Sequence, residues 1–155
     1  MRAVAIVDTS VFCNVLDIPK MNSDRAQVMQ ELKQYLESDT NLLLPMAAVY
    51  ETGNHIAQIK TQNRSGSNRR HHAEQFIGQV KKAIVGEAPW QVIQVPTLQE
   101  IEGWLNAFPD SAMRGAGVGD LSIIKEWEKL KNKIPNRRIF IWSLDKDLQG
   151  YDYCP

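Results

Sequence analysis

The sequence predicts an α/β domain, a three-layer α/β/α sandwich with a mainly parallel central sheet. Short apolar runs of strand character alternate along the chain with longer segments of helical periodicity. The first run, residues 3–7, is apolar throughout, which is typical of a strand covered on both faces of a parallel sheet. The 155 residues, 43% of them hydrophobic, suit one core and are too few for two. We therefore expect residues 1–155 to form a single domain.

The predicted elements follow one another in a regular order. Four short runs rich in Val, Ile, Leu or aromatic residues are the predicted strands: 3–7, 42–44, 92–95 and 139–142. Apolar residues recur at helical spacing between them. The predicted helices begin at Ser23 (with Met29, Leu32 and Leu36), at Pro45 (with Ala48, Thr52, Ile56 and Ile59), at Arg69 (with Ala73, Phe76, Ile77, Val80 and Ile84), at Thr97 and near Gly119. Thr97 and Glu100 are spaced as a capping box, and residues 62–68 are a predicted loop.

The composition excludes some classes of protein. The chain has 18 basic and 18 acidic residues, so its net charge is zero and it is not a uniformly basic nucleic-acid binder. The charges are segregated, however, because residues 60–82 hold six basic residues and one acidic residue. Cys13 and Cys154 lie far apart without metal-ligand spacing, which argues against a zinc site or a disulfide scaffold. No apolar run approaches the roughly 20 residues of a membrane span, so we expect a cytoplasmic protein.

Two aspartates follow predicted strands. Asp8 comes directly after the first strand, and Asp145 follows the last one within the segment Ser143–Leu148. The functional crevice of an open α/β sheet lies beyond the carboxyl ends of its strands, so both positions suit a site. Aspartates that cap a helix or close a turn are also common there, and each residue taken singly fits either interpretation.

Two further acids lie on predicted helices. Asp120 precedes Ile123 and Trp127 by three and seven residues, so a helix that begins at or before it places this carboxylate within the apolar stripe. If the helix begins one residue later, Asp120 is an N-cap. Glu51 lies on the flank of the helix that contains Ala48, pointing half inward, and also fits a boundary glutamate that extends to water.

Taken together, the four acids predict a metal centre. Carboxylates from different elements that meet in one crevice repel one another unless a cation is bound between them. A ligand set made only of carboxylate oxygens suits Mg²⁺ or Mn²⁺, which retain waters and bridge to phosphate groups, and does not suit Zn²⁺. The sequence thus predicts chemistry directed at a phosphate.

These residues resemble the PIN-domain ribonucleases, most closely the single-domain toxins of prokaryotic toxin–antitoxin pairs. The family pattern has a strand that ends in Asp-[Thr/Ser]-[Ser/Asn], a Glu on an early helix, an Asp opening a late helix, and [Thr/Ser]-x-Asp-x-[Asp/His]-[Phe/Leu] after a strand. In this chain the pattern reads Asp8-Thr9-Ser10, Glu51, Asp120 and Ser143-Leu144-Asp145-Lys146-Asp147-Leu148. The resemblance spans nearly the whole chain and departs from the family at residues 60–90, which are longer and more basic than the smallest members require.

The resemblance implies an activity and a site. Asp8, Glu51, Asp120 and Asp145 would be catalytic ligands of Mg²⁺ or Mn²⁺, with Asp147 as a further metal ligand or a cap of the following turn. Thr9 and Ser143 would hold carboxylates in place, and Ser10 would contact the metal, water or phosphate unless it caps a helix beginning at Val11. The implied reaction is hydrolysis of RNA by a metal-activated water, leaving a 5′-phosphate and a 3′-hydroxyl. The implied partners are an antitoxin protein and a second copy of the chain.

The basic segment is the predicted RNA-binding surface. Flanking phosphates need basic residues at the rim of an acidic crevice, and the candidates are Lys60, Arg64, Arg69 and Arg70. A solvated helix face and an antitoxin-facing surface are the alternatives. The alternative function is a catalytically silent PIN-like module that binds RNA or protein. A histidine-based ribonuclease using His55, His71 and His72 is disfavoured, because adjacent residues of a helix face different ways.

Overall fold

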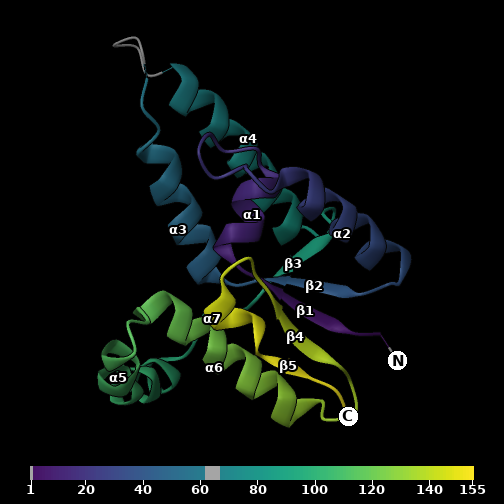
Figure 1. Ribbon diagram of the computed structural model, residues 1–155, viewed down its shortest axis with the longest axis vertical. Helices are drawn as coiled ribbons and strands as arrows, with labels where there is room; N and C mark the ends of the chain where they lie inside the picture. The colour runs from purple at the N-terminus through teal and green to yellow at the C-terminus, as the bar shows by residue number, and fades with distance from the viewer. Residues whose placement is uncertain (1, 62–66) are drawn as a thin grey trace.

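Five strands form one sheet in a computed structural model that describes residues 2–61 and 67–155 (Figure 1). The order across the sheet is β3-β2-β1-β4-β5. Its first four strands are parallel, and β5 pairs antiparallel with β4 at the edge. The strands are β1 (Val4–Val7), β2 (Asn41–Leu44), β3 (Trp90–Val92), β4 (Ile139–Trp142) and β5 (Asp152–Tyr153). The predicted α/β class with a mainly parallel sheet is therefore confirmed.

Helices cover both faces of this sheet. They are α1 (Thr9–Val15), α2 (Arg25–Glu37), α3 (Met46–Ala57), α4 (Ser67–Ile84), α5 (Leu98–Met113), α6 (Val118–Lys133) and α7 (Lys146–Gln149). Successive residues of a strand point to opposite faces. Ala5 and Val7 accordingly pack in the core with α1 to α4, whereas Ile6 packs with Ile123 of α6. Figure 1 shows α1 to α4 above the sheet, α5 and α6 below it and α7 at the left-hand end of the strands, an arrangement compatible with three layers.

Some predicted boundaries and core positions are wrong. The third strand covers Trp90–Val92 and not 92–95, because its neighbour β2 ends at Leu44 before Pro45, and Pro96 has no N–H to extend the ladder. In α2 the buried residues are Val28 and Leu32, whereas Met29 is 37% and Leu36 is 47% exposed. The side of this helix that packs on the core holds Val28, Leu32 and the half-buried Tyr35, so Met29 and Leu36 beside it reach solvent.

The predicted start of the last long helix needs a small shift. Helix α6 begins at Val118 with Gly117 as its N-cap, so Asp120 is in the first turn and the N-cap interpretation of Asp120 is wrong. The capping box of Thr97 and Glu100 is present at the start of α5, as predicted. The predicted loop over 62–68 falls mostly outside the described residues. No helix in the described ranges is both long enough and apolar enough to cross a bilayer.

The topology brings two predicted site segments together. Strands β1 and β4 are neighbours, and Val7 lies in register with Trp142 at their carboxyl ends. The N–H of Asp8 donates to the carbonyl of Trp142 at 3.0 Å, which continues the ladder one step beyond β1. The segments that follow the two strands, Asp8–Ser10 and Ser143–Asp147, therefore start side by side at one edge of the sheet.

Candidate metal centre

Asp8 is the buried anchor of the candidate site. Only 4% of its surface is exposed, and its Oδ2 atom accepts hydrogen bonds from Ser10 Oγ at 2.8 Å and from Ser143 Oγ at 2.7 Å. Asp8 occupies the N-cap position of α1, but its side chain makes no capping hydrogen bond. The carboxylate is therefore held by side-chain hydroxyl groups from two segments. It does not cap the first backbone N–H groups of α1.

The same two serines fix the loop that follows β4. Ser143 Oγ accepts the N–H of Asp145 at 2.9 Å, and Ser10 Oγ accepts the N–H of Leu144 at 3.0 Å. Ser10 lies inside α1, which begins at Thr9, so the interpretation of Ser10 as a cap of a helix from Val11 is wrong. Hydroxyl groups that both donate to a carboxylate and accept from a neighbouring backbone hold that carboxylate in a set orientation.

Glu51 reaches the site from α3. Thr9 Oγ1 donates to its Oε2 atom at 2.7 Å. Its Oε1 atom lies against Gly119 in the first turn of α6, so close that a Cβ at position 119 would be 2.0 Å from it. A glycine at this position is therefore what lets the Glu51 carboxylate lie against the start of α6. The sequence alone indicates no role for Gly119, because only the packing of α3 against α6 reveals it.

Asp120 follows Gly119 and is surrounded by negative charge. Burial, and after it the nearby charges of Asp8, Glu51, Asp145 and Asp147, raise the pKa of its carboxyl group to about 6. None of these five carboxylates forms an ion pair with a lysine or arginine of the described chain. The fold thus brings the five predicted acids within electrostatic reach of one another, and none of them is ion-paired within the described chain, although Arg114 and Lys125 line the same cavity as Asp120 and Asp147.

Asp145 and Asp147 form the exposed side of the cluster. Asp145 is the N-cap of the short helix α7, and its Oδ1 accepts the N–H of Asp147 at 2.9 Å. The capping interpretation of Asp145 therefore holds in this structure, alongside its place near the other acids. Asp147 and Asp120 line a common cavity of about 410 Å³, which puts Asp147 on the same side of the site as the first turn of α6.

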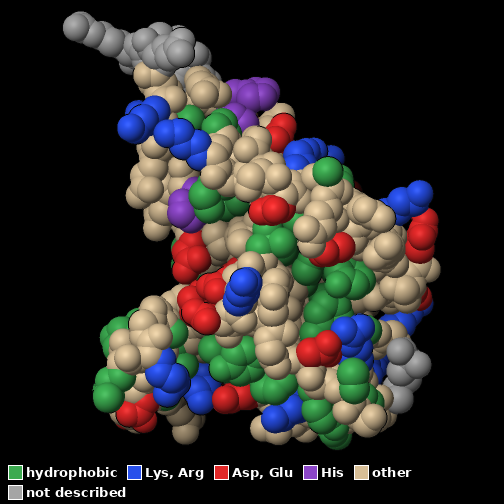
Figure 2. Space-filling view, viewed as in Figure 1, with side chains coloured by type: hydrophobic (Ala, Val, Ile, Leu, Met, Phe, Trp, Pro, Cys, Tyr) green, Lys and Arg blue, Asp and Glu red, His purple; other side chains and the backbone are tan. Residues whose placement is uncertain are grey.

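The donor chemistry of the cluster fits a hard divalent cation. All of its side chains offer carboxylate oxygens, the ligands that Mg²⁺ and Mn²⁺ prefer. As the side chains now stand, no three Asp, Glu, His or Cys residues in the described ranges are arranged to hold a metal ion. The hydrogen bonds of Glu51 and Asp145 each use one carboxylate oxygen, Oε2 toward Thr9 and Oδ1 toward the N–H of Asp147, so in the described chain the other oxygen of each is left for a cation after small shifts of the side chains. Figure 2 shows acidic side chains gathered at the inner end of a hollow, below the arm that α3 and α4 form in Figure 1.

The predicted RNA-binding residues lie on that arm. Lys60 is exposed just beyond the end of α3. In the first turns of α4, Arg69 Nε donates to the carbonyl of Ile59 at 2.6 Å, and Arg70 forms an exposed ion pair with Glu74 at 2.8 Å. Arg64 lies outside the described residues. Both described arginines therefore already have partners within the arm.

The chain was also compared with known proteins. No protein-family model matches it, and no curated protein matches it.

Proposed function

We propose that this protein is a divalent-metal-dependent endoribonuclease with a PIN-like fold, which hydrolyses phosphodiester bonds of RNA. One observation supports this above the others. Asp120 of α6 and the four carboxylates around it, from the end of β1, from α3 and from the segment after β4, form no ion pair in the described chain. Such a cluster is unfavourable in an isolated fold and is explained by a cation that it binds during its function.

Each side chain has a distinct task in this proposal. Asp8, Glu51, Asp120 and Asp145 would hold Mg²⁺ or Mn²⁺, and Asp147 would complete the set. A bound ion of this kind supplies Lewis-acid activation of water and neutralises charge on the phosphoryl group. Ser10 and Ser143 orient Asp8, and Thr9 orients Glu51. Asp120 has the raised pKa and must lose its proton to become a ligand, so it makes the site sensitive to mildly acidic pH.

We also propose, from the sequence resemblance to the PIN toxins, that the protein acts as a toxin and has protein partners. The four motif pieces occur in the order of the PIN toxins, and the acids in them are those that the fold brings together. An antitoxin protein would then cover the acidic hollow and block RNA, and a second copy of the chain would form a homodimer. Co-expression of the chain with the product of a small neighbouring gene tests the toxin role. Growth arrest by the chain alone, relieved by that product, supports it.

A catalytically silent PIN-like binding module is the second candidate. The observation that favours it is that no three acidic side chains now stand in a metal-ligating arrangement in the described part of the chain. The two candidates differ in one respect. The enzyme must bring its carboxylates together around a metal, whereas the silent module needs no metal at all.

Cleavage of RNA by the purified chain separates the two candidates. The chain is incubated with single-stranded and structured RNAs in Mn²⁺, in Mg²⁺ and in EDTA, and the product ends are analysed. We expect metal-dependent cuts with 5′-phosphate ends. Asp8→Asn and Asp120→Asn should each lower the rate by roughly 100-fold or more, since each removes a ligand charge.

A matched control shows whether such losses are specific to the site. Asp39→Asn makes the same chemical change in an exposed residue just before β2. This residue lies near the amino ends of the strands, away from the site at their carboxyl ends, and its replacement should leave the rate unchanged. Circular dichroism spectra establish that all three variants are folded. Intact RNA with every metal and every substrate, from a protein that is folded, would favour the silent module.

A further inference from the structure

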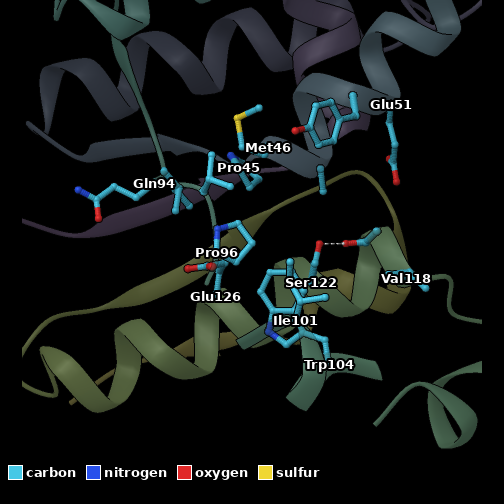
Figure 3. A pocket seen from close by; sticks show the side chains of 15 residues that line it. Pro45, Met46, Glu51, Gln94, Pro96, Ile101, Trp104, Val118, Ser122 and Glu126 are labelled. Carbon is cyan, nitrogen blue, oxygen red and sulfur yellow. Dashed lines mark hydrogen bonds between the residues drawn. The ribbon is translucent and has the colours of Figure 1, made fainter. Parts of the chain in front are cut away.

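A second cavity, of about 390 Å³, adjoins the metal centre and shares Glu51 and Gly119 with it (Figure 3). Figure 3 shows Trp104 and Ile101 of α5 on one side of this cavity and Met46 of α3 on the other. Its walls are mostly apolar: Pro45, Met46, Ala47, Ile93, Val95, Pro96, Ile101, Trp104 and Val118. The cavity is therefore a nonpolar slot that opens beside the acids proposed to bind the metal.

One buried carboxylate lines this nonpolar slot. Glu126 of α6 is 6% exposed, and within the described ranges it makes neither a hydrogen bond nor an ion pair. The nearest cation, Lys129, donates instead to Glu100 at 2.8 Å. A buried polar group without a partner is costly, and a buried charge costs more. The fully buried side-chain atoms without a partner in the described ranges are His72 Nδ1 and Trp90 Nε1, so the unpaired oxygens of Glu126 keep some accessible surface and are open to the slot.

The other polar groups that line the cavity in the described chain do not donate to these oxygens. The hydroxyl of Ser122 lies one helical turn before Glu126 and donates to the carbonyl of Gly119 at 2.6 Å, as the dashed line in Figure 3 shows. No hydrogen bond joins Gln94 or the indole N–H of Trp104 to Glu126 in the described part of the chain. The open oxygens of Glu126 can therefore accept from water, or from the donors of a molecule that replaces that water in the slot.

We propose that this slot binds a guanine base of the RNA substrate, with Glu126 accepting two hydrogen bonds from the base. Guanine presents two parallel donors, N1–H and the exocyclic amine, and a carboxylate accepts such a pair with both oxygens. Adenine and cytosine place an acceptor beside their amine, and uracil places its single N–H between two carbonyl groups. Those three bases each leave a carboxylate oxygen opposite another acceptor, which is unfavourable.

The surroundings of Glu126 fit the rest of a nucleotide. The ring of Trp104 offers a face on which a base can stack. Glu126 is seven residues beyond Gly119 on α6, about 10 Å along the helix axis. A nucleotide whose phosphate lies at the carboxylate cluster can therefore extend its base toward Glu126. The inference rests on the proposed ribonuclease function for the identity of the ligand as RNA, and it adds which base the enzyme selects near the cut.

Titration with nucleosides tests the slot without metal or catalysis. Guanosine, inosine, adenosine and uridine are added to ¹⁵N-labelled protein in EDTA, and the indole N–H signal of Trp104 is followed by NMR after assignment with Trp104→Phe. Nucleosides have no phosphate for the acidic cluster to repel. We expect guanosine to shift this signal saturably. Inosine lacks the exocyclic amine and should bind at least about tenfold more weakly.

Two variants identify the group that recognises the base. Glu126→Gln keeps the size of the side chain but replaces one acceptor with a donor, and it should remove the preference for guanosine over inosine. Glu102→Gln makes the same change at an exposed position of α5 and should leave the preference intact. Unfolding by urea should be at least as difficult for Glu126→Gln as for the wild type, because the substitution removes a buried charge.

The outcomes separate this inference from the proposed function. Equal shifts with all nucleosides, a guanosine preference that persists in Glu126→Gln, or a Trp104 signal that responds only to protein concentration would each overturn the inference. A signal that responds only to protein concentration would show that a second copy of the chain, and not a nucleoside, contacts the slot. Metal-dependent cleavage of RNA without guanine at the cut would overturn the inference alone. A Glu126-dependent guanosine preference in a protein that cuts no RNA would support the slot and refute the nuclease.

Discussion

The replacement Gly119→Ala tests the link between packing and metal binding most directly. The added Cβ would lie 2.0 Å from Glu51 Oε1 and 3.2 Å from Glu51 Cδ, far inside van der Waals contact. Both atoms belong to the end of a flexible side chain, so the helix can remain in place while the carboxylate moves away. That movement breaks the 2.7 Å hydrogen bond from Thr9. We therefore expect a folded protein in which Glu51 no longer points into the acidic cluster.

The contacts at Gly119 allow an estimate of how the replacement changes stability and metal affinity. Ala in place of Gly stabilises a helix by roughly 0.5–1 kcal/mol, and breaking the hydrogen bond to a charged group costs about 1.5 kcal/mol, so the metal-free stability changes little. Removal of an oriented carboxylate typically lowers metal affinity about 10- to 100-fold. At a Mn²⁺ concentration of 100 times the wild-type Kd, binding stabilises the wild type by about 2.7 kcal/mol and the variant by only about 0.4–1.4 kcal/mol.

Thermal unfolding with and without Mn²⁺ measures this difference. For a chain of this size about 1 kcal/mol corresponds to roughly 2–4 °C, so Mn²⁺ should raise the Tm of the wild type by about 5–10 °C and that of Gly119→Ala by about half as much or less. Gly103→Ala is the matched control, because a Cβ there meets nothing within 4 Å. It should keep the full Mn²⁺ shift. Equal Mn²⁺ shifts and equal cleavage rates in Gly119→Ala and the wild type would refute Glu51 as a metal ligand.

Asp120, Ser143 and the arm of α3 and α4 give three further predictions. In metal-free protein the raised pKa of Asp120 means that its ionisation opposes folding; Asp120→Asn should therefore be more stable than the wild type by roughly 1 kcal/mol above pH 6, after allowance for solvent screening. This advantage should vanish in urea titrations as the pH falls from about 6 toward 3.8, and an advantage independent of pH would contradict it. Ser143→Ala removes the 2.7 Å hydrogen bond to buried Asp8 and should lower the free energy of unfolding by roughly 1.5–3 kcal/mol; a decrease below about 0.5 kcal/mol would mean that solvent replaces the bond. Charge reversal at Arg69 and Arg70 should weaken RNA binding and reduce its salt slope by about 0.7 for each phosphate that the protein no longer neutralises, whereas an unchanged slope in fluorescence anisotropy would show that α4 does not bind RNA.

The fold was predictable where burial on both faces leaves a continuous apolar run. Residues 4–7 and 139–142 are strands whose side chains pack on both sides of a parallel sheet, whereas in 41–44 buried and half-buried side chains alternate. Strand β5 has only two residues at an edge, and α7 is a single turn, so neither produces a periodic signal. The limits of β3 depend on where its neighbour β2 ends, which is a tertiary constraint.

The site was predictable in part for a related reason. Asp8 and Asp145 were identifiable because a polar residue directly after a buried strand lies at a known edge of the sheet. Gly119 and Glu126 were missed, since their roles depend on which helix packs against α6 and on the cavity beside it. A signal for Glu126 was present: it lies three residues after Ile123 and one before Trp127, next to the apolar stripe. An acid at such a position fits a helix-boundary residue equally well, and only burial distinguishes the two.

The electrostatics of the molecule link metal binding to RNA binding. A net charge of zero provides no overall attraction for a polyanion, and the hollow itself holds five carboxylates without a cationic partner in the described chain. Of the two arginines at the start of α4, Arg70 is offset by its ion pair with Glu74, whereas Arg69 donates to the neutral carbonyl of Ile59 and keeps its charge. Arg114 and Lys125 line the cavity with Asp120 and Asp147, but the five carboxylates outnumber them, so a divalent cation at the cluster favours the approach of a phosphate. We therefore expect the divalent cation to bind before the RNA. A base bound at Glu126 would then add selectivity once the phosphate has bound at the cluster.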